Sequence, residues 1–228
     1  MKGLFYSTVK SNRGYFIAAF VAFLCSIAAG SVILTIVRQN DDSMGIAFFS
    51  VLFLPLLPTF ILCEFFGRDL ERNIKSGFLN YTLSSIPRRS FVLSQLLTNI
   101  IFSTLGLVMG LGMLGIFRAV GGEEWVGSYY FRILIMAVIA GSIVEWICIP
   151  VTIALKSAEK AGLAVGVVLG FGLVMPLAAV YNSVMTEFEF DVNILISTEA
   201  MLIEAGVALA VYAVVYLICM RILKGGIR

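Results

Sequence analysis

The stretch that decides the fold is Phe91–Phe117, FVLSQLLTNIIFSTLGLVMGLGMLGIF, which runs for 27 residues without a charged side chain. A helix needs about 20 mainly apolar residues to cross a bilayer, so this stretch suffices for one crossing. Because membrane barrel strands would alternate over about ten residues each, long apolar runs favour helices. Five more such runs flank it: Tyr15–Val37, Ile46–Phe66, Ile133–Leu155, Ala161–Tyr181 and Ala200–Met220. The sequence therefore predicts an all-α, polytopic membrane protein with six transmembrane helices. Short loops join them, so residues 1–228 form a single transmembrane domain.

The composition excludes several classes of protein. Hydrophobic residues make up 60% of the chain and charged residues 13%, with a mean hydropathy of +1.01, which is too apolar for a water-soluble domain of this length. Histidine is absent, which removes Ser-His and Cys-His catalysis and histidine-ligated metals. The four cysteines lie inside apolar runs, so we expect buried thiols rather than disulfides or metal ligands. A net charge of +2 is too balanced for a nucleic-acid-binding protein.

The distribution of Lys and Arg predicts the orientation of the chain in the membrane. With a cytoplasmic N-terminus, 13 of the 16 basic residues fall on the cytoplasmic side, and only Arg38, Arg118 and Arg132 fall outside. Cytoplasmic loops of membrane proteins carry such an excess of positive charge. Both termini are therefore predicted to be cytoplasmic.

The longest predicted cytoplasmic segment, Glu64 to Phe91, has an amphipathic pattern. Apolar side chains recur at spacings of four, four and three residues, on one side of a helix, at Leu70, Ile74, Phe78 and Tyr81. Charged side chains occupy the other faces, at Arg68, Asp69, Glu71, Arg72 and Lys75. This predicts a short helix at about Gly67–Tyr81, which either lies in the headgroup layer as a connector or docks on a soluble partner. Its mixed charge favours the protein partner.

Two segments resemble the permease subunits of type-2 ABC transporters, most closely the small permeases of bacterial exporters of amphipathic peptides such as phenol-soluble modulins. One is NYTLSSIPRRSFVLSQLL, residues 80–97, which follows the charged helix after Glu64. The other is MKGLFYSTVKSNRGYF at the N-terminus, which is similar to the amphipathic elbow helix of that family. The six-span layout extends the resemblance over the whole chain. Gln95 departs from the pattern, since many relatives carry lysine there.

The resemblance implies a transport subunit that another chain drives. In that family two permease subunits, identical or closely related, pair in the bacterial cell membrane and rest on two cytosolic ATPase subunits that bind ATP and Mg. The helix after the second span would be the coupling helix, and its candidate contacts with the ATPase are Arg68, Asp69, Glu71, Arg72, Lys75 and Tyr81. The sequence agrees in lacking a G-x-x-x-x-G-K-[ST] loop, so we expect no P-loop ATPase activity and no bound cofactor in this chain.

Glu145, near the middle of the fourth run, is a candidate for the translocation path. A carboxylate at mid-bilayer costs about 2.5–3.5 kcal/mol on insertion scales. Glu145 would either line the path or couple to protons, or it would make a hydrogen bond between helices. If it couples to protons, the chain could be a secondary transporter. A third alternative is the substrate-binding membrane component of a vitamin importer.

Glycines at G-x-x-x-G spacing mark places where helices can approach closely. Gly162, Gly166 and Gly170 have this spacing in the fifth run, and Gly106 and Gly110 have it in the third. In the family that the chain resembles, the fifth span contributes to the dimer seam. The fifth-run glycines therefore pack either against a second subunit or within the same chain.

Overall fold

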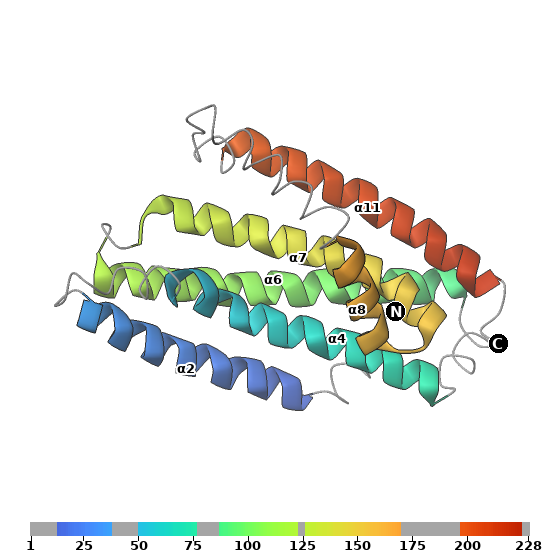
Figure 1. Ribbon diagram of the computed structural model, residues 1–228, viewed down its shortest axis with the longest axis horizontal. Coiled ribbons are helices and arrows are strands. Elements are labelled where there is room, and N and C mark those ends of the chain that lie inside the picture. Colours follow the sequence, from blue (N-terminus) through green and yellow to red (C-terminus); the bar gives the residue numbers. More distant parts are fainter. Residues whose placement is uncertain (1–12, 38–49, 77–86, 123–125, 170–196, 225–228) are drawn as a thin grey trace.

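The computed structural model describes residues 13–37, 50–76, 87–122, 126–169 and 197–224, and these ranges contain helices and no strand (Figure 1). This confirms the all-α prediction for the described part of the chain. The helices are α2 (Arg13–Val37), α4 (Leu57–Lys75), α6 (Arg88–Gly121), α7 (Ser128–Leu155), α8 (Ala158–Leu169) and α11 (Thr198–Lys224), and a short 3₁₀ turn, η2 (Leu54–Leu56), precedes α4.

Five helical segments of the described chain are long and apolar enough to cross a membrane: Arg13–Val37, Ser50–Lys75, Arg88–Gly121, Ser128–Leu155 and Thr198–Lys224. α8 has 12 residues, which is fewer than a crossing requires. The rest of the predicted fifth run lies outside the described residues, as does the predicted elbow before Arg13. The sixth crossing and the elbow helix therefore stay predictions.

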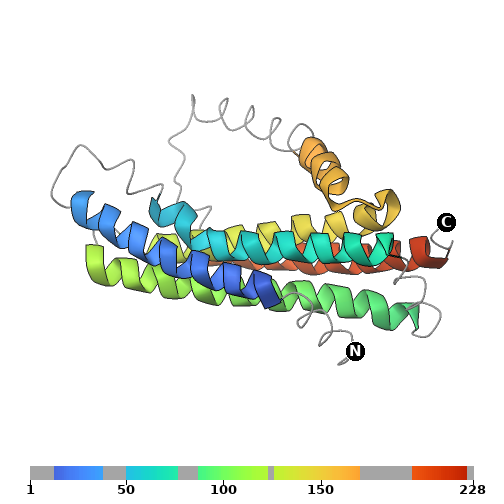
Figure 2. The same ribbon diagram turned by 90° about the horizontal axis from the view of Figure 1, so that it is seen from below.

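The five long helices lie side by side, while α8 turns away from the bundle (Figures 1 and 2). α4, α7 and α11 run in one direction, and α2 and α6 run in the opposite direction. These directions bring the end of α4, the start of α6, the end of α7 and the end of α11 to one end of the bundle. Ten of the twelve described Lys and Arg residues lie toward this end, and Arg118 and Arg132 lie toward the other. We call it the basic end.

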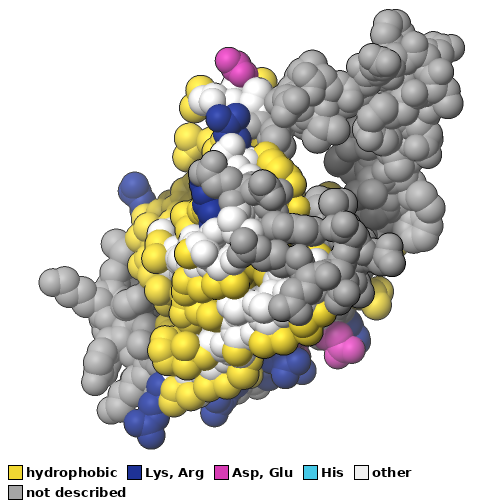
Figure 3. Space-filling view, turned by 90° about the vertical axis from the view of Figure 1, so that its left-hand side faces the viewer, with side chains coloured by type: hydrophobic (Ala, Val, Ile, Leu, Met, Phe, Trp, Pro, Cys, Tyr) yellow, Lys and Arg dark blue, Asp and Glu magenta, His cyan; other side chains and the backbone are white. Residues whose placement is uncertain are grey.

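The outer surface of the bundle is strongly apolar. Phe20 on α2 is 55% exposed, and Leu202 and Leu209 on α11 are 69% and 71% exposed. Figure 3, which views the molecule from the end opposite the basic end, shows hydrophobic side chains over most of the described surface. Apolar surface of this extent is compatible with helices that have lipid as their solvent.

α4 and α6 approach each other closely at the two glycines of α6. A Cβ at Gly106 would lie 2.4 Å from Oγ1 and 2.7 Å from Cα of Thr59, and a Cβ at Gly110 would lie 2.7 Å from the carbonyl oxygen of Pro55. The G-x-x-x-G spacing of the third run therefore serves helix packing within the chain.

The prediction of a separate helix at Gly67–Tyr81 was wrong, because α4 runs through Gly67 without interruption. Gly67 to Lys75 continue the second span as one uninterrupted helix. Leu70 and Ile74 are buried in the core that α4 shares with α6, α7 and α11, as the predicted apolar stripe requires. Phe78 and Tyr81 lie outside the described residues.

The absence of a strong helix breaker explains this continuity. Gly67 is the poorest helix former between Glu64 and Lys75, and a glycine in a helix interior costs only about 1 kcal/mol relative to alanine. One ion pair of the favourable i,i+4 orientation, acid before base, spans Gly67, and a second follows it. The charged segment is therefore a continuous helical extension of the second long helix.

Candidate functional site

The charged extension of α4 presents cations at the basic end. Arg68 Nε donates to Glu64 Oε1 at 2.7 Å, and Lys75 forms an ion pair with Glu71 one turn further on. Arg72 and the side chain of Lys75 are exposed. A shallow hollow of about 480 Å³ on this extension is lined by Arg68, Glu71, Arg72, Lys75 and Ser76, so it carries both positive and negative side chains.

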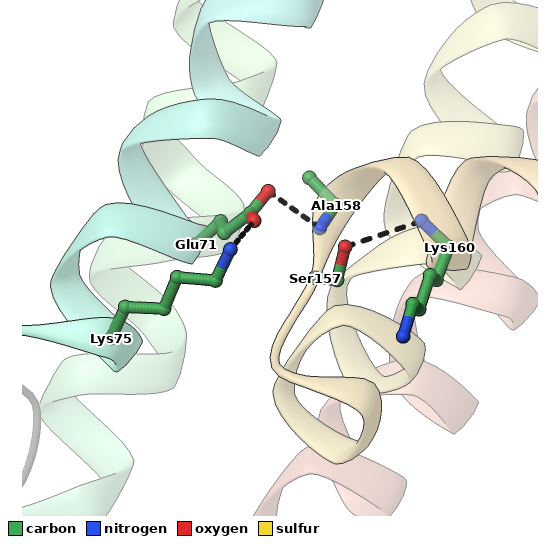
Figure 4. Close-up of polar contacts among 5 residues, drawn as sticks. All are labelled: Glu71, Lys75, Ser157, Ala158 and Lys160. Atoms are coloured by element: carbon green, nitrogen blue, oxygen red, sulfur yellow. Dashed lines mark hydrogen bonds and ion pairs between the residues drawn. The ribbon is translucent and has the colours of Figure 1, made fainter.

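Glu71 also connects α4 to α8, as Figure 4 shows. Its Oε2 accepts a hydrogen bond of 2.9 Å from the backbone amide of Ala158, the first residue of α8. Ser157 caps the same helix, because its Oγ accepts a hydrogen bond of 3.4 Å from the amide of Lys160. A carboxylate is stabilising at a helix N-terminus, where unpaired amides and the helix dipole favour negative charge. Glu71 thus ties the start of α8 to the cation-bearing surface of α4.

The turn between α7 and α8 is compact enough to make this contact possible. Lys156 ends α7 in the left-handed conformation, with a φ of 54°, and Ser157 follows it as the residue before α8. The chain therefore turns within two residues and brings the Ala158 amide within hydrogen-bonding distance of the Glu71 carboxylate. Glu159, in the first turn of α8, adds a second acid at this N-terminus.

A polar cavity of about 580 Å³ lies between α4, α7 and α8. Four glutamates and one arginine line it: Glu64, Glu71, Glu145, Glu159 and Arg68. The remaining lining is small or apolar and includes Cys63, Cys148, Thr152, Gly162 and Leu163. Glu64 and Glu71 form ion pairs on α4 with Arg68 and Lys75, whereas Glu145 and Glu159 form no ion pair within the described part of the chain. The cavity suits water, protons or a cationic group.

The structure thus brings Glu145 together with Glu64, Arg68 and Glu71 of the predicted coupling segment. Glu145 is a partly buried residue of α7 that lines this cavity, and among the described residues it has no hydrogen-bonding neighbour on another helix. Gly162 and Gly166 of the fifth run have open space where a Cβ would lie, with no atom within 4 Å, in contrast to Gly106 and Gly110. Gly170 and Tyr81 lie outside the described residues.

Asp69 does not fit its predicted role as a contact for a partner. It is only 8% exposed, and its Oδ2 accepts a hydrogen bond of 3.1 Å from Nδ2 of Asn73. Asp69 directly precedes Leu70 on α4 and turns with it toward the protein interior. Arg68, Glu71, Arg72 and Lys75 remain on the accessible side.

Three contributors to the site were not among the residues that the sequence singled out: Glu159, Ser157 and the amide of Ala158. A serine followed by an acid in the next turn is a helix-start signal, which could have located the beginning of α8. The contact between Glu71 and Ala158 spans 87 positions, and no local pattern announces it. Within the described ranges, no group of three or more cysteines and carboxylates is arranged to hold a metal ion.

Comparison with known proteins identifies no relative, since no family model, no curated protein and no solved structure matches the chain.

The connection between Glu71 and α8 can be tested by hydrogen exchange. We expect Glu71→Gln to speed exchange at the first-turn amides of α8 by about fivefold, which corresponds to the roughly 1 kcal/mol that a helix cap contributes. Glu64→Gln is the matched control, because Glu64 forms the equivalent i,i+4 pair on α4 but is 63% exposed and binds to no amide of α8. Equal exchange in both variants would contradict the connection.

Proposed function

We propose that this chain is the transmembrane subunit of an ATP-driven exporter of the ABC type, which moves amphipathic or hydrophobic peptides out of a bacterial cell. A separate ATPase, present in two copies, would supply ATP hydrolysis and dock on the accessible cations of α4. The observation that carries the proposal is the extension of α4. A rigid helix that starts in the bundle and ends in an exposed surface of Arg68, Arg72 and Lys75 can transmit a push from a cytosolic partner.

The orientation and the partners in this proposal have separate support. The gathering of ten basic residues at one end favours a cytoplasmic basic end in the cell membrane, with both termini inside. The open surface at Gly162 and Gly166 favours pairing of α8 with a second permease subunit, identical or closely related. The apolar outer surface suits a cargo that enters sideways from the inner leaflet, where amphipathic peptides already lie.

Reconstitution tests the proposal. The purified chain in proteoliposomes should hydrolyse no ATP and transport no fluorescent amphipathic helical peptide. Addition of a candidate P-loop ATPase from the same genome should start both activities, and vanadate or omission of Mg should stop them. Transport by the chain alone, driven by a proton gradient, would overturn the proposal.

The polar cavity gives specific support to one alternative, a proton-coupled transporter. Glu145 lies there with Glu64, at the interface of α4 and α7, and carboxylates inside transporters commonly serve as proton relays. Such a transporter would work without ATP, would stop when the proton gradient is dissipated, and would lose coupling in Glu145→Gln. Nothing in the described residues favours the vitamin-importer alternative.

A further inference from the structure

An apolar groove lies between α7 and α11, on the outside of the bundle and away from the polar cavity. Its volume is about 600 Å³, and no polar atom contributes to its lining. α7 provides Ile147, Pro150 and Leu155 among its lining residues, and α11 provides Ala210, Val211 and Ile222. From Ala210 to Ile222 the groove extends along α11 for about 18 Å, at about 1.5 Å per residue. One leaflet of a bilayer has about half of the 30 Å hydrocarbon core, so the groove has the length of one lipid chain.

The groove opens toward a positively charged rim. The last apolar residue of α7 in the groove is Leu155, and the exposed Lys156 follows it directly. Arg221 on α11 is exposed and lies one turn beyond Ile218, the last groove residue before it. In a view down the helix axis, the 3.6-residue repeat places Arg221 between Ala210 and Val214, so it lies on the side of α11 that lines the groove. Lys224 follows one turn later at the edge of that face. An apolar slot that ends in cations at the membrane surface is complementary to a lipid with an anionic headgroup.

We infer that this groove binds one acyl chain of an anionic phospholipid from the leaflet at the basic end, with the lipid phosphate at Arg221. The acyl chain would fill the groove, which has no polar atoms in its lining. The phosphate would accept two parallel hydrogen bonds from the guanidinium group of Arg221. The inference does not depend on the proposed transport function, because it concerns the α7–α11 surface rather than the α4 surface.

Trp146 provides a probe for the inner end of this groove. Its indole is 7% exposed and packs edge-on against Tyr212 of α11, with 5.4 Å between ring centroids. The neighbours of these two residues, Ile147 and Val211, line the groove. Because the indole is buried and the next residue lines the groove, Trp146 reports on a short-range quencher that occupies the groove.

The experiment measures quenching of Trp146 by lipids with brominated acyl chains in the full-length chain, with Trp125→Phe to leave a single tryptophan. In vesicles with equal mole fractions, brominated phosphatidylglycerol should quench at least threefold more effectively per molecule than brominated phosphatidylcholine. Arg221→Gln should reduce this preference to near one. Arg89→Gln, which removes an exposed cation from the same end of the bundle on α6, should leave it unchanged.

A second pair of variants tests the slot itself. Ala210→Phe places a ring in the groove and should cut quenching by both lipids by half or more. Leu209→Phe, at the neighbouring position that does not line the groove, should not. Three results would each overturn the inference. The two lipids could quench equally in the parent, or Arg89→Gln and Arg221→Gln could have equal effects. The third is that neither lipid quenches because a second copy of the chain covers the groove.

Discussion

Charge reversal at Arg72 and Lys75, as Arg72→Glu with Lys75→Glu, should weaken association with the proposed ATPase partner at least tenfold and abolish the proposed ATP-driven transport. Both side chains line the exposed hollow on α4. The double variant places two additional carboxylates beside Glu71, so a surface that presented cations becomes acidic. Like charges brought together across an interface cost several kcal/mol, and every 1.4 kcal/mol is a factor of ten in affinity.

The matched control is Arg88→Glu with Arg89→Glu. These two residues are exposed, lie at the same end of the bundle and start α6, so the change in net charge at the basic end is the same. Association is measured by titration of the ATPase onto the chain in nanodiscs, and transport is measured by peptide uptake into inverted vesicles. If both double variants lose association equally, the effect is one of total charge and the assignment of α4 fails.

A single variant separates loss of docking from loss of the α4–α8 connection. Lys75→Glu also breaks the pair with Glu71 that helps to hold the Ala158 amide. Arg72→Glu leaves that pair in place, so it should still weaken association while the amides of α8 keep their protection from exchange.

The sequence predicted which segments of this chain form helices better than it predicted where those helices end. Apolar runs identify membrane helices because a crossing helix must be apolar over its whole length. The end of a helix depends on capping and on breaking residues, which give weaker signals. Gly67 illustrates this point, since the change from apolar to charged composition near it marks the end of the apolar run but not the end of α4.

The candidate site shows a second limit of sequence patterns. The spacing of Leu70 and Ile74 correctly indicated which side of α4 is buried, because periodicity reports the direction of the core. It could not reveal that Asp69 is also buried, since burial of a polar side chain depends on a partner such as Asn73. The meeting of Glu145 with Glu71 likewise depends on how α4, α7 and α8 pack.

Identical spacing of glycines has two outcomes in this chain. In α6 the positions of Gly106 and Gly110 are filled by α4 and η2, whereas in α8 those of Gly162 and Gly166 are open. The spacing states only that two small residues share one helix face. Which helix covers that face is a tertiary property, and it determines what a substitution does.

The α6 glycines therefore give the largest expected effect on stability. We expect Gly106→Val to prevent stable folding, because its Cβ would lie 2.7 Å from the Cα of Thr59, a backbone atom that cannot move without displacing α4. Gly106→Ala introduces the same Cβ without further atoms. It should destabilise the chain by about 1–3 kcal/mol, the usual cost of overpacking a close contact.

Gly112 is the matched control on the same helix. It has nothing within 4 Å of a Cβ, so Gly112→Ala should be neutral or stabilising by up to about 1 kcal/mol, since alanine is the better helix former. The comparison uses the fraction of monodisperse protein that survives heating in detergent, followed by size-exclusion chromatography. Equal survival of Gly106→Ala and Gly112→Ala would mean that α4 and α6 do not meet at Thr59. The proposed mechanism would then lose the close contact between α4 and α6, which is the contact that would transmit a push from the end of α4 to the bundle.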